Sequence, residues 1–145
     1  MVSDNTGSDS VTVDYNLSIG IWHHVALVFS DQNNQASFYV DGQQRGATQA
    51  IARRIVDSTE PLYVGANDYS CGQDNTLFDG QLDDVRIWNA TRSATDIANS
   101  MSTELDAQSG LIAYWQFNND LTDSSGNGHT LSNTSGATFS TDVPF

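Results

Sequence analysis

Residues with oxygen-bearing side chains gather in two stretches of the chain, and together they offer the ligands that a calcium ion requires. Calcium takes about six to eight oxygens from carboxylates, amide carbonyls and backbone carbonyls, usually supplied by flexible turns. One stretch is the DSSGNG turn at residues 123–128, and the other is the long loop at residues 65–76, with Asn67, Asp68, Gln73, Asp74 and Asn75. The spacing is not that of an EF-hand loop. The same residue types are also ordinary turn formers, so both interpretations stay open.

Carbohydrate recognition would use a different set of side chains. An aromatic ring stacks on the C–H face of a pyranose, while Asp, Asn or Arg side chains bond its hydroxyls. Tyr69 lies in the long loop and Trp22 at the start of a strand-like stretch, so these are the candidate ligand-binding rings, with Asn67 and Asp68 as polar partners. Trp88 and Trp115 fall in alternating patterns that favour a place in the core.

No arrangement of residues predicts catalysis. A glycosidase needs two carboxyl groups facing each other across a sugar-binding groove, and the two glutamates, Glu60 and Glu104, fall outside the strand patterns. Asp84 alternates with Arg86 on one strand face, which favours a structural ion pair over a nucleophile. No nucleophile elbow, zinc-protease motif or phosphate loop is present, and Cys71 has no neighbouring histidine in the sequence. We therefore expect a protein that is not an enzyme.

The net charge of the chain excludes some classes of binding partner. With 18 acidic and 5 basic residues, all of the latter arginine, the net charge is -13. Nucleic acid and anionic membranes need a basic footprint to displace their counterions, so neither is an expected partner. The single cysteine leaves no internal disulfide. The sequence has no apolar run long enough for membrane insertion and no leader after Met1.

The patterning of apolar residues predicts an all-β chain of one domain. Alternation with period two recurs about every ten residues, separated by turn signals, as in a sandwich or barrel. Residues 1–10 are polar and predict a flexible start, whereas Ser93 with Asp96 predicts a capped helix at about 93–101. Val25, Leu27, Val85 and Ile87 are expected to be buried. The predicted strands cover residues 11–15, 22–30, 36–40, 43–50, 62–64, 82–88, 111–117, 130–133 and 137–140.

Three motifs resemble one known family. They are FDG followed by LDDVRIW and SATDI at residues 78–97, WHHVALVF followed by FYVDG at residues 22–42, and AYWQF followed by DSSGNG at residues 113–128. Together they are similar to the closing strand and helix, the central strand and hairpin, and the opening strand and turn of laminin-G-like, or concanavalin-A-like, domains, to which the pentraxins are related. The resemblance implies an antiparallel jelly-roll β-sandwich with one short helix.

The order of the motifs departs from that family, because the opening strand and turn follow the closing strand and helix. The resemblance therefore implies a single domain over residues 1–145 that is truncated or permuted, with residues 111–145 in the permuted position. A sandwich with neighbouring termini tolerates permutation. Otherwise a homodimer would cover the exposed or exchanged strands.

The resemblance also implies a function. Related jelly rolls hold a structural calcium between the closing strand and the opening turn, which makes Asp84 and Asp123 the strongest candidate ligands, with Asp79, Asp83 and Asn127 beside them. We expect a non-catalytic binding or adhesion module for carbohydrate or an extracellular protein ligand, at the cell surface or outside the cell, with calcium optional. The alternatives are a structural spacer repeat of a secreted protein and an accessory module of a polysaccharide-degrading enzyme.

Overall fold

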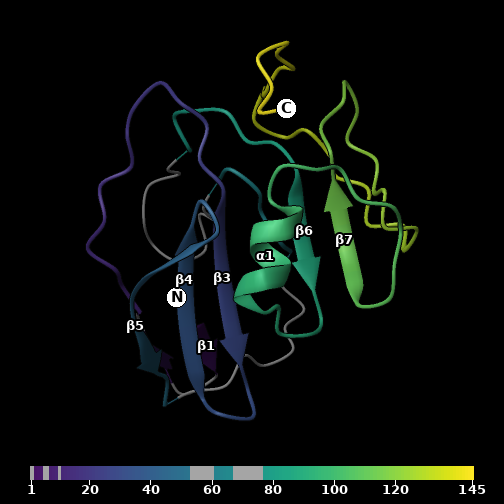
Figure 1. Cartoon of the computed structure of the whole chain (residues 1–145). Coiled ribbons are helices and arrows are strands. Elements are labelled where there is room, and N and C mark those ends of the chain that lie inside the picture. Colours follow the sequence, from purple (N-terminus) through teal and green to yellow (C-terminus); the bar gives the residue numbers. More distant parts are fainter. Residues whose placement is uncertain (1, 5–6, 10, 53–60, 67–76) are drawn as a thin grey trace.

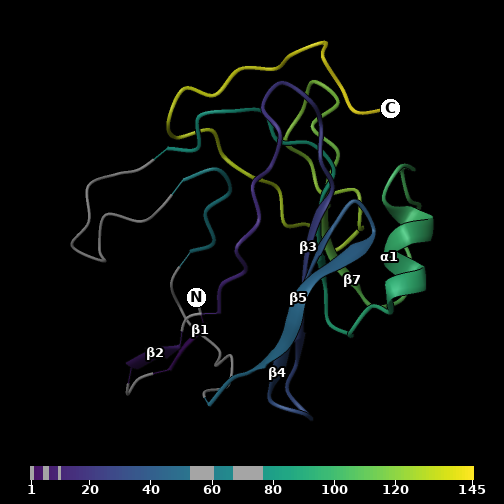
Figure 2. The same cartoon turned by 60° about the vertical axis from the view of Figure 1, so that its left-hand side comes forward.

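The computed structural model describes residues 2–4, 7–9, 11–52, 61–66 and 77–145. Figure 1 shows a three-stranded sheet and a two-stranded sheet with the helix α1 in front of them, and Figure 2 shows a short N-terminal hairpin to one side. In chain order the elements are β1 (Val2–Asp4), β2 (Gly7–Asp9), β3 (Val25–Ser30), β4 (Gln35–Val40), β5 (Gln43–Ala50), β6 (Val85–Trp88), α1 (Ala94–Ser100) and β7 (Leu111–Trp115). All described strand pairs are antiparallel.

The larger sheet has the order β3-β4-β5, so β4 is its central strand. The turn between β4 and β5 is Asp41-Gly42, whose φ angles of 51° and 72° are those of a tight hairpin turn. Asp and Gly suit it because they adopt positive φ at low cost. Ala36, Tyr39 and Val40 of β4 are all buried, so both faces of this strand are covered.

The smaller sheet pairs β6 with β7, and the chain between these two strands contains α1 and the polar link at residues 101–110. Apart from its second residue, β7 is fully buried, and Tyr114 is the most deeply buried large side chain of the described residues. The predicted strand at residues 111–117 and its burial on both faces are therefore confirmed over Leu111–Trp115.

Helix α1 begins as predicted. The side-chain oxygen of Ser93 accepts a hydrogen bond from the backbone nitrogen of Asp96 at 3.1 Å, and the Asp96 carboxylate accepts one from the Ser93 backbone nitrogen at 3.1 Å. This reciprocal capping box satisfies two backbone donors that the first helical turn leaves without partners. Only Ile97 of the helix is buried, so the helix lies on the surface of the sheets, on one side of the molecule in Figure 2.

The chain before β3 passes along β5 without forming a strand. The side-chain amide of Gln49 brackets Thr12, accepting from its backbone nitrogen at 3.3 Å and donating to its carbonyl at 2.5 Å. Gly46 lies directly beneath Val13, since a Cβ atom at Gly46 would come within 2.5 Å of the Val13 side chain. The predicted strand at residues 11–15 is thus wrong as a strand, because side-chain bonds replace the backbone ladder.

Several further expectations are corrected. Val2–Asp4 and Gly7–Asp9 pair as the antiparallel strands β1 and β2, where the sequence predicts no strand. Residues 62–64, 130–133 and 137–140 are not strands, because these short stretches have no ladder partner in the described chain. The strands predicted at residues 22–30 and 82–88 begin three residues later, at Val25 and Val85.

The sequence predicts that Val25 and Leu27 lie in the core. This is wrong, because the two residues are 57% and 50% exposed. Their cross-strand partners Val40 and Phe38 are better covered. The reason is that β4 has a neighbour on both sides, whereas β3 is an edge strand of its sheet. Val85 and Ile87 are half-buried.

The contact between the β4–β5 turn and α1 gives a test of the fold. A Cβ atom at Gly42 would lie 3.2 Å from both the Cα and the Cβ of Ala98, whereas one at Gly20, with φ of 78°, would meet nothing within 4 Å. We expect Gly42→Ala to lower the free energy of unfolding by about 1–3 kcal/mol more than Gly20→Ala, because overpacking adds to the strain of positive φ. Urea unfolding measures both variants. Equal losses would show that the helix does not press on the turn.

Candidate functional site

The charged residues at the start of β6 form a network in the interior, not a site open to ligands. Arg86 donates to Asp84 Oδ1 at 3.1 Å, to the carbonyl of Ser100 at 2.7 Å and to that of Thr103 at 2.5 Å. The Tyr114 hydroxyl donates to Asp84, and its ring lies 4.9 Å from the guanidinium carbon of Arg86. The side chains of Arg86 and Asp84 are only 9% and 14% exposed. The predicted structural ion pair between them is therefore observed.

The second candidate carboxylate, Asp123, organises the DSSGNG turn. Its Oδ1 accepts from the backbone nitrogens of Tyr114 at 3.0 Å and Ser125 at 2.9 Å, and its Oδ2 from that of His129 at 2.9 Å. Burial alone would raise the pKa of Asp123, but these hydrogen bonds lower it far below its ordinary value. The carboxylate thus fixes the turn to β7.

The candidate calcium ligands lie in different surroundings. Asp84 and Asp123 contact opposite ends of Tyr114, its hydroxyl and its backbone nitrogen. Asp83 accepts from the backbone nitrogen of Asp84 at 3.0 Å, and Asp79 is exposed. Asn127 uses its side-chain nitrogen to bond the carbonyls of Leu111 and Ile112. Within the described ranges, no three His, Cys, Asp or Glu residues gather in a way that could hold a metal ion. A calcium site at these residues stays a prediction.

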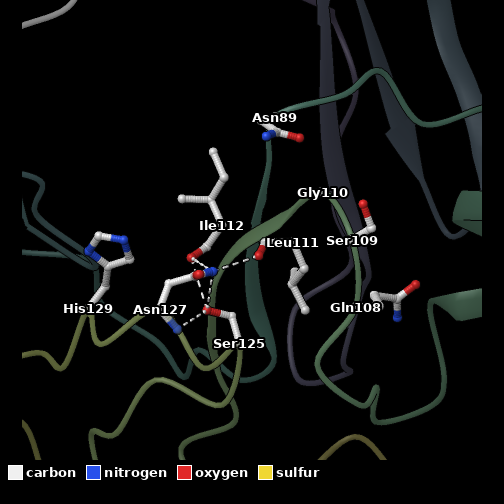
Figure 3. A pocket seen from close by; sticks show the side chains of 9 residues that line it. All are labelled: Asn89, Gln108, Ser109, Gly110, Leu111, Ile112, Ser125, Asn127 and His129. Carbon is white, nitrogen blue, oxygen red and sulfur yellow. Dashed lines mark hydrogen bonds between the residues drawn. The ribbon is translucent and has the colours of Figure 1, made fainter.

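A polar pocket of about 550 Å³ lies beside this turn (Figure 3). Figure 3 shows the Asn127 side chain turned toward β7, where Ser125 Oγ also donates to the Ile112 carbonyl at 2.9 Å. These groups are occupied in holding the turn, and the described lining contains no Phe, Tyr or Trp ring. The residues that line it are Asn89, Gln108, Ser109, Gly110, Leu111, Ile112, Ser125, Asn127 and His129.

A larger groove, of about 850 Å³, is lined by Trp22. The C-terminal segment forms one of its walls and passes over the end of the sheets in Figures 1 and 2. We call it the Trp22 groove. Trp22 is half-buried, and its indole nitrogen donates to Asp142 Oδ1 at 3.3 Å. Its described aromatic and acidic lining residues are Trp22, Tyr63, Phe78, Phe117, Phe139, Asp83 and Asp142.

The other predicted ligand-binding residues, Tyr69, Asn67 and Asp68, lie outside the described residues. The residues on either side of their loop, Ala66 and Leu77, form an antiparallel bridge, and both line the Trp22 groove. The sequence therefore directs attention to the region of the groove through Trp22, but it misses Tyr63, Phe78 and Phe117. The sequence predicts Tyr63 to lie in a strand, and no local pattern reveals that it is 42% exposed.

A histidine pair joins β3 to the β4–β5 turn. His23 Nδ1 lies 2.9 Å from Asp41 Oδ2, and the backbone nitrogen of His24 donates to Asp41 Oδ1 at 3.0 Å. Burial and then the charge of Arg86 lower the pKa of His24 below its ordinary value of 6.5, while Asp41 and Asp84 act in the opposite direction. His24 is thus a neutral side chain kept beside a cation.

These features define the class of protein: antiparallel β-sheets packed as a sandwich, with a groove across one end. The family follows from the comparison with family models. The chain belongs to the concanavalin A-like lectin/glucanases superfamily, whose laminin G-type model matches residues 1–98. No curated protein matches it.

Among solved structures, the chain is similar to the crystal structure of a "putative carbohydrate binding protein" from Bacteroides ovatus. The two share 22% sequence identity with a TM-score of 0.71, a level of likeness that shows the fold alone. The match covers 84% of this chain and 37% of that one, so the chain spans little more than a third of the length of its neighbour.

The Arg86 network gives a second test. Arg86→Gln leaves the partly buried Asp84 carboxylate without its cation, and we expect it to lower the free energy of unfolding by about 3–5 kcal/mol. The control is Arg92→Gln, because Arg92 is 3.9 Å from Asp96 and lies on the surface, where ion pairs contribute little. Chemical denaturation compares the two. Losses of similar size would mean that the Arg86 network does not stabilise the fold.

His24 gives a prediction of pH dependence. Since its folded-state pKa is lowered, the unfolded state binds the proton more readily as the pH falls through 6.5. The contribution of His24 to stability is therefore present above pH 6.5 and is lost below it. Denaturant midpoints of the native protein and of His24→Gln, measured from pH 7.5 to pH 5.5, should converge toward the acidic end. Parallel curves would contradict the assignment.

Proposed function

We propose that this chain is a non-catalytic carbohydrate-binding module that holds a glycan in the Trp22 groove. The observation that carries the proposal is the composition of the groove, in which aromatic rings lie beside hydroxyl, amide and carboxylate groups. Binding sites for small polar ligands are concave and largely apolar, with a few polar groups that fix orientation.

The exposure of the aromatic rings supports this proposal. Tyr63 is 42% and Phe78 is 56% exposed, and the ring faces of such residues attract the C–H groups of a sugar. Hydrogen bonding is available from Asp142 and from the serines and threonines of the C-terminal wall. The polar pocket of Figure 3 has hydroxyl and amide groups but no such ring in its described lining.

The superfamily and the description of the structural neighbour support the same function. The superfamily is named for lectins and glucanases, and the neighbour is described as a carbohydrate-binding protein. We place the chain among the binding members because both described carboxylates of the groove already accept hydrogen bonds from the protein, Asp83 from the backbone nitrogen of Asp84 and Asp142 from the indole of Trp22. Glu104, the described glutamate, bonds Asn118 at 2.8 Å and does not line the groove. The remaining parts of the proposal are a place at the cell surface or outside the cell, a glycan on another cell or matrix as the partner, and an optional calcium ion. No described helix is long and apolar enough to cross a membrane.

Binding to a panel of immobilised polysaccharides, with and without a chelator, tests the proposal. We expect at least one polysaccharide to bind, without release of reducing ends. Tyr63→Ala should weaken that binding about three- to tenfold, since an aromatic contact contributes about 0.5–1.5 kcal/mol beyond the burial of its area. The control is Tyr15→Ala, which removes a ring of similar exposure, 40%, outside the groove. Absence of binding in both conditions, or equal effects of the two variants, would reject this function for the groove.

A further inference from the structure

The charges that line the Trp22 groove have one sign. Its described lining contains two carboxylates, Asp83 and Asp142, and no arginine, lysine or histidine. Carboxylates are ionised at neutral pH, and at close range a like charge is repelled strongly where the surroundings exclude water. Within the described lining, the groove therefore offers acceptors for hydroxyl groups and no cation that would neutralise an anion.

The arginines of the described chain are engaged elsewhere. Arg45 stacks on Tyr15 at 4.6 Å, Arg92 stacks on the Trp88 ring at 4.2 Å, and Arg86 is held in the buried network with Asp84. The chain has no lysine. No described cation is thus free to move toward the groove and pair with a sulfate or a uronic acid.

The surroundings of both groove carboxylates add to the negative potential. Burial is the main cause that raises the pKa of Asp83, and the charges of Asp84 and Glu104 act in the same direction. Asp142 accepts the indole N–H of Trp22 through Oδ1, so its charge lies at the edge of the ring on which a sugar would stack. Charged acceptors bond hydroxyl groups more strongly than neutral ones. The net charge of -13 acts in the same direction over a longer range.

We propose that the Trp22 groove selects uncharged polysaccharides, which present only hydroxyl groups, and rejects chains that carry uronic acids or sulfates. This selectivity rests on the carbohydrate-binding function proposed above. The carboxylates then have two effects: they accept hydrogen bonds from sugar hydroxyls, and they exclude the acidic polymers of matrices and cell walls.

The experiment uses pairs of polymers that differ in charge: hydroxyethyl cellulose with carboxymethyl cellulose, dextran with dextran sulfate, and any neutral polysaccharide that binds with its C6-oxidised form. We expect binding to neutral members only, with at least a tenfold loss on oxidation at low salt. The loss should shrink in about 1 M salt, where the screening length falls to about 3 Å.

Asp142→Asn identifies the source of the rejection. An asparagine carbonyl can still accept from Trp22, so the variant removes the charge and keeps the bond. We expect it to reduce the loss on oxidation several-fold, whereas Asp14→Asn, an exposed change of equal charge outside the groove, should not. Equal or tighter binding of acidic polymers would overturn the selectivity and leave the binding function standing. Equal effects of the two variants would remove the groove as its source, and no binding to any polymer would reject both proposals.

Discussion

The guanidinium of Arg86 is the contact on which the smaller sheet and its surroundings depend. The Arg86 side chain extends from β6. It donates hydrogen bonds to Asp84, just before that strand, and to the carbonyls of Ser100 and Thr103, where α1 ends. These carbonyls have no partner within the helix. The guanidinium gives these carbonyls a charged hydrogen-bond donor, so it connects the end of the helix to the start of the strand without a regular turn. Because few groups in the interior could replace it, the network is costly to break.

Tyr114 connects that network to the groove. Its hydroxyl meets Asp84, while its backbone nitrogen and carbonyl bond Asp123 and Ser124 of the glycine turn. The chain then passes Phe117, in a left-handed conformation with φ of 56°, into the wall of the Trp22 groove. The position of the groove wall is thus set from the buried end of β7. Most residues that line the groove take no part in these hydrogen bonds, so their exposure and charge can differ without disturbing β7.

Local patterns in the sequence predict the parts of this structure that local physics decides. The Ser93–Asp96 cap, the Asp41-Gly42 turn, the buried Trp115 and the pairing of Asp84 with Arg86 all depend on residues close in the chain or on one strand. The failures have a different cause. Whether Val25 is buried depends on which strands flank β3, and whether residues 130–140 form strands depends on a partner elsewhere in the chain. The alternation of apolar and polar residues shows which side chains a strand could bury. It does not show whether another strand or segment lies over them.

The candidate site shows the same limit. Trp22 could be picked out because it stands alone at the start of a strand, but Tyr63 and Phe78 come to the groove from segments without regular structure. Their roles depend on where the C-terminal segment crosses the sheets, and short-range periodicity carries no information about that crossing. Charge is different, because it adds up without reference to geometry. The net charge of -13 therefore predicts, from composition alone, that nucleic acid and anionic membranes are poor partners, whereas the selectivity that we propose for the groove depends on where Asp83 and Asp142 lie.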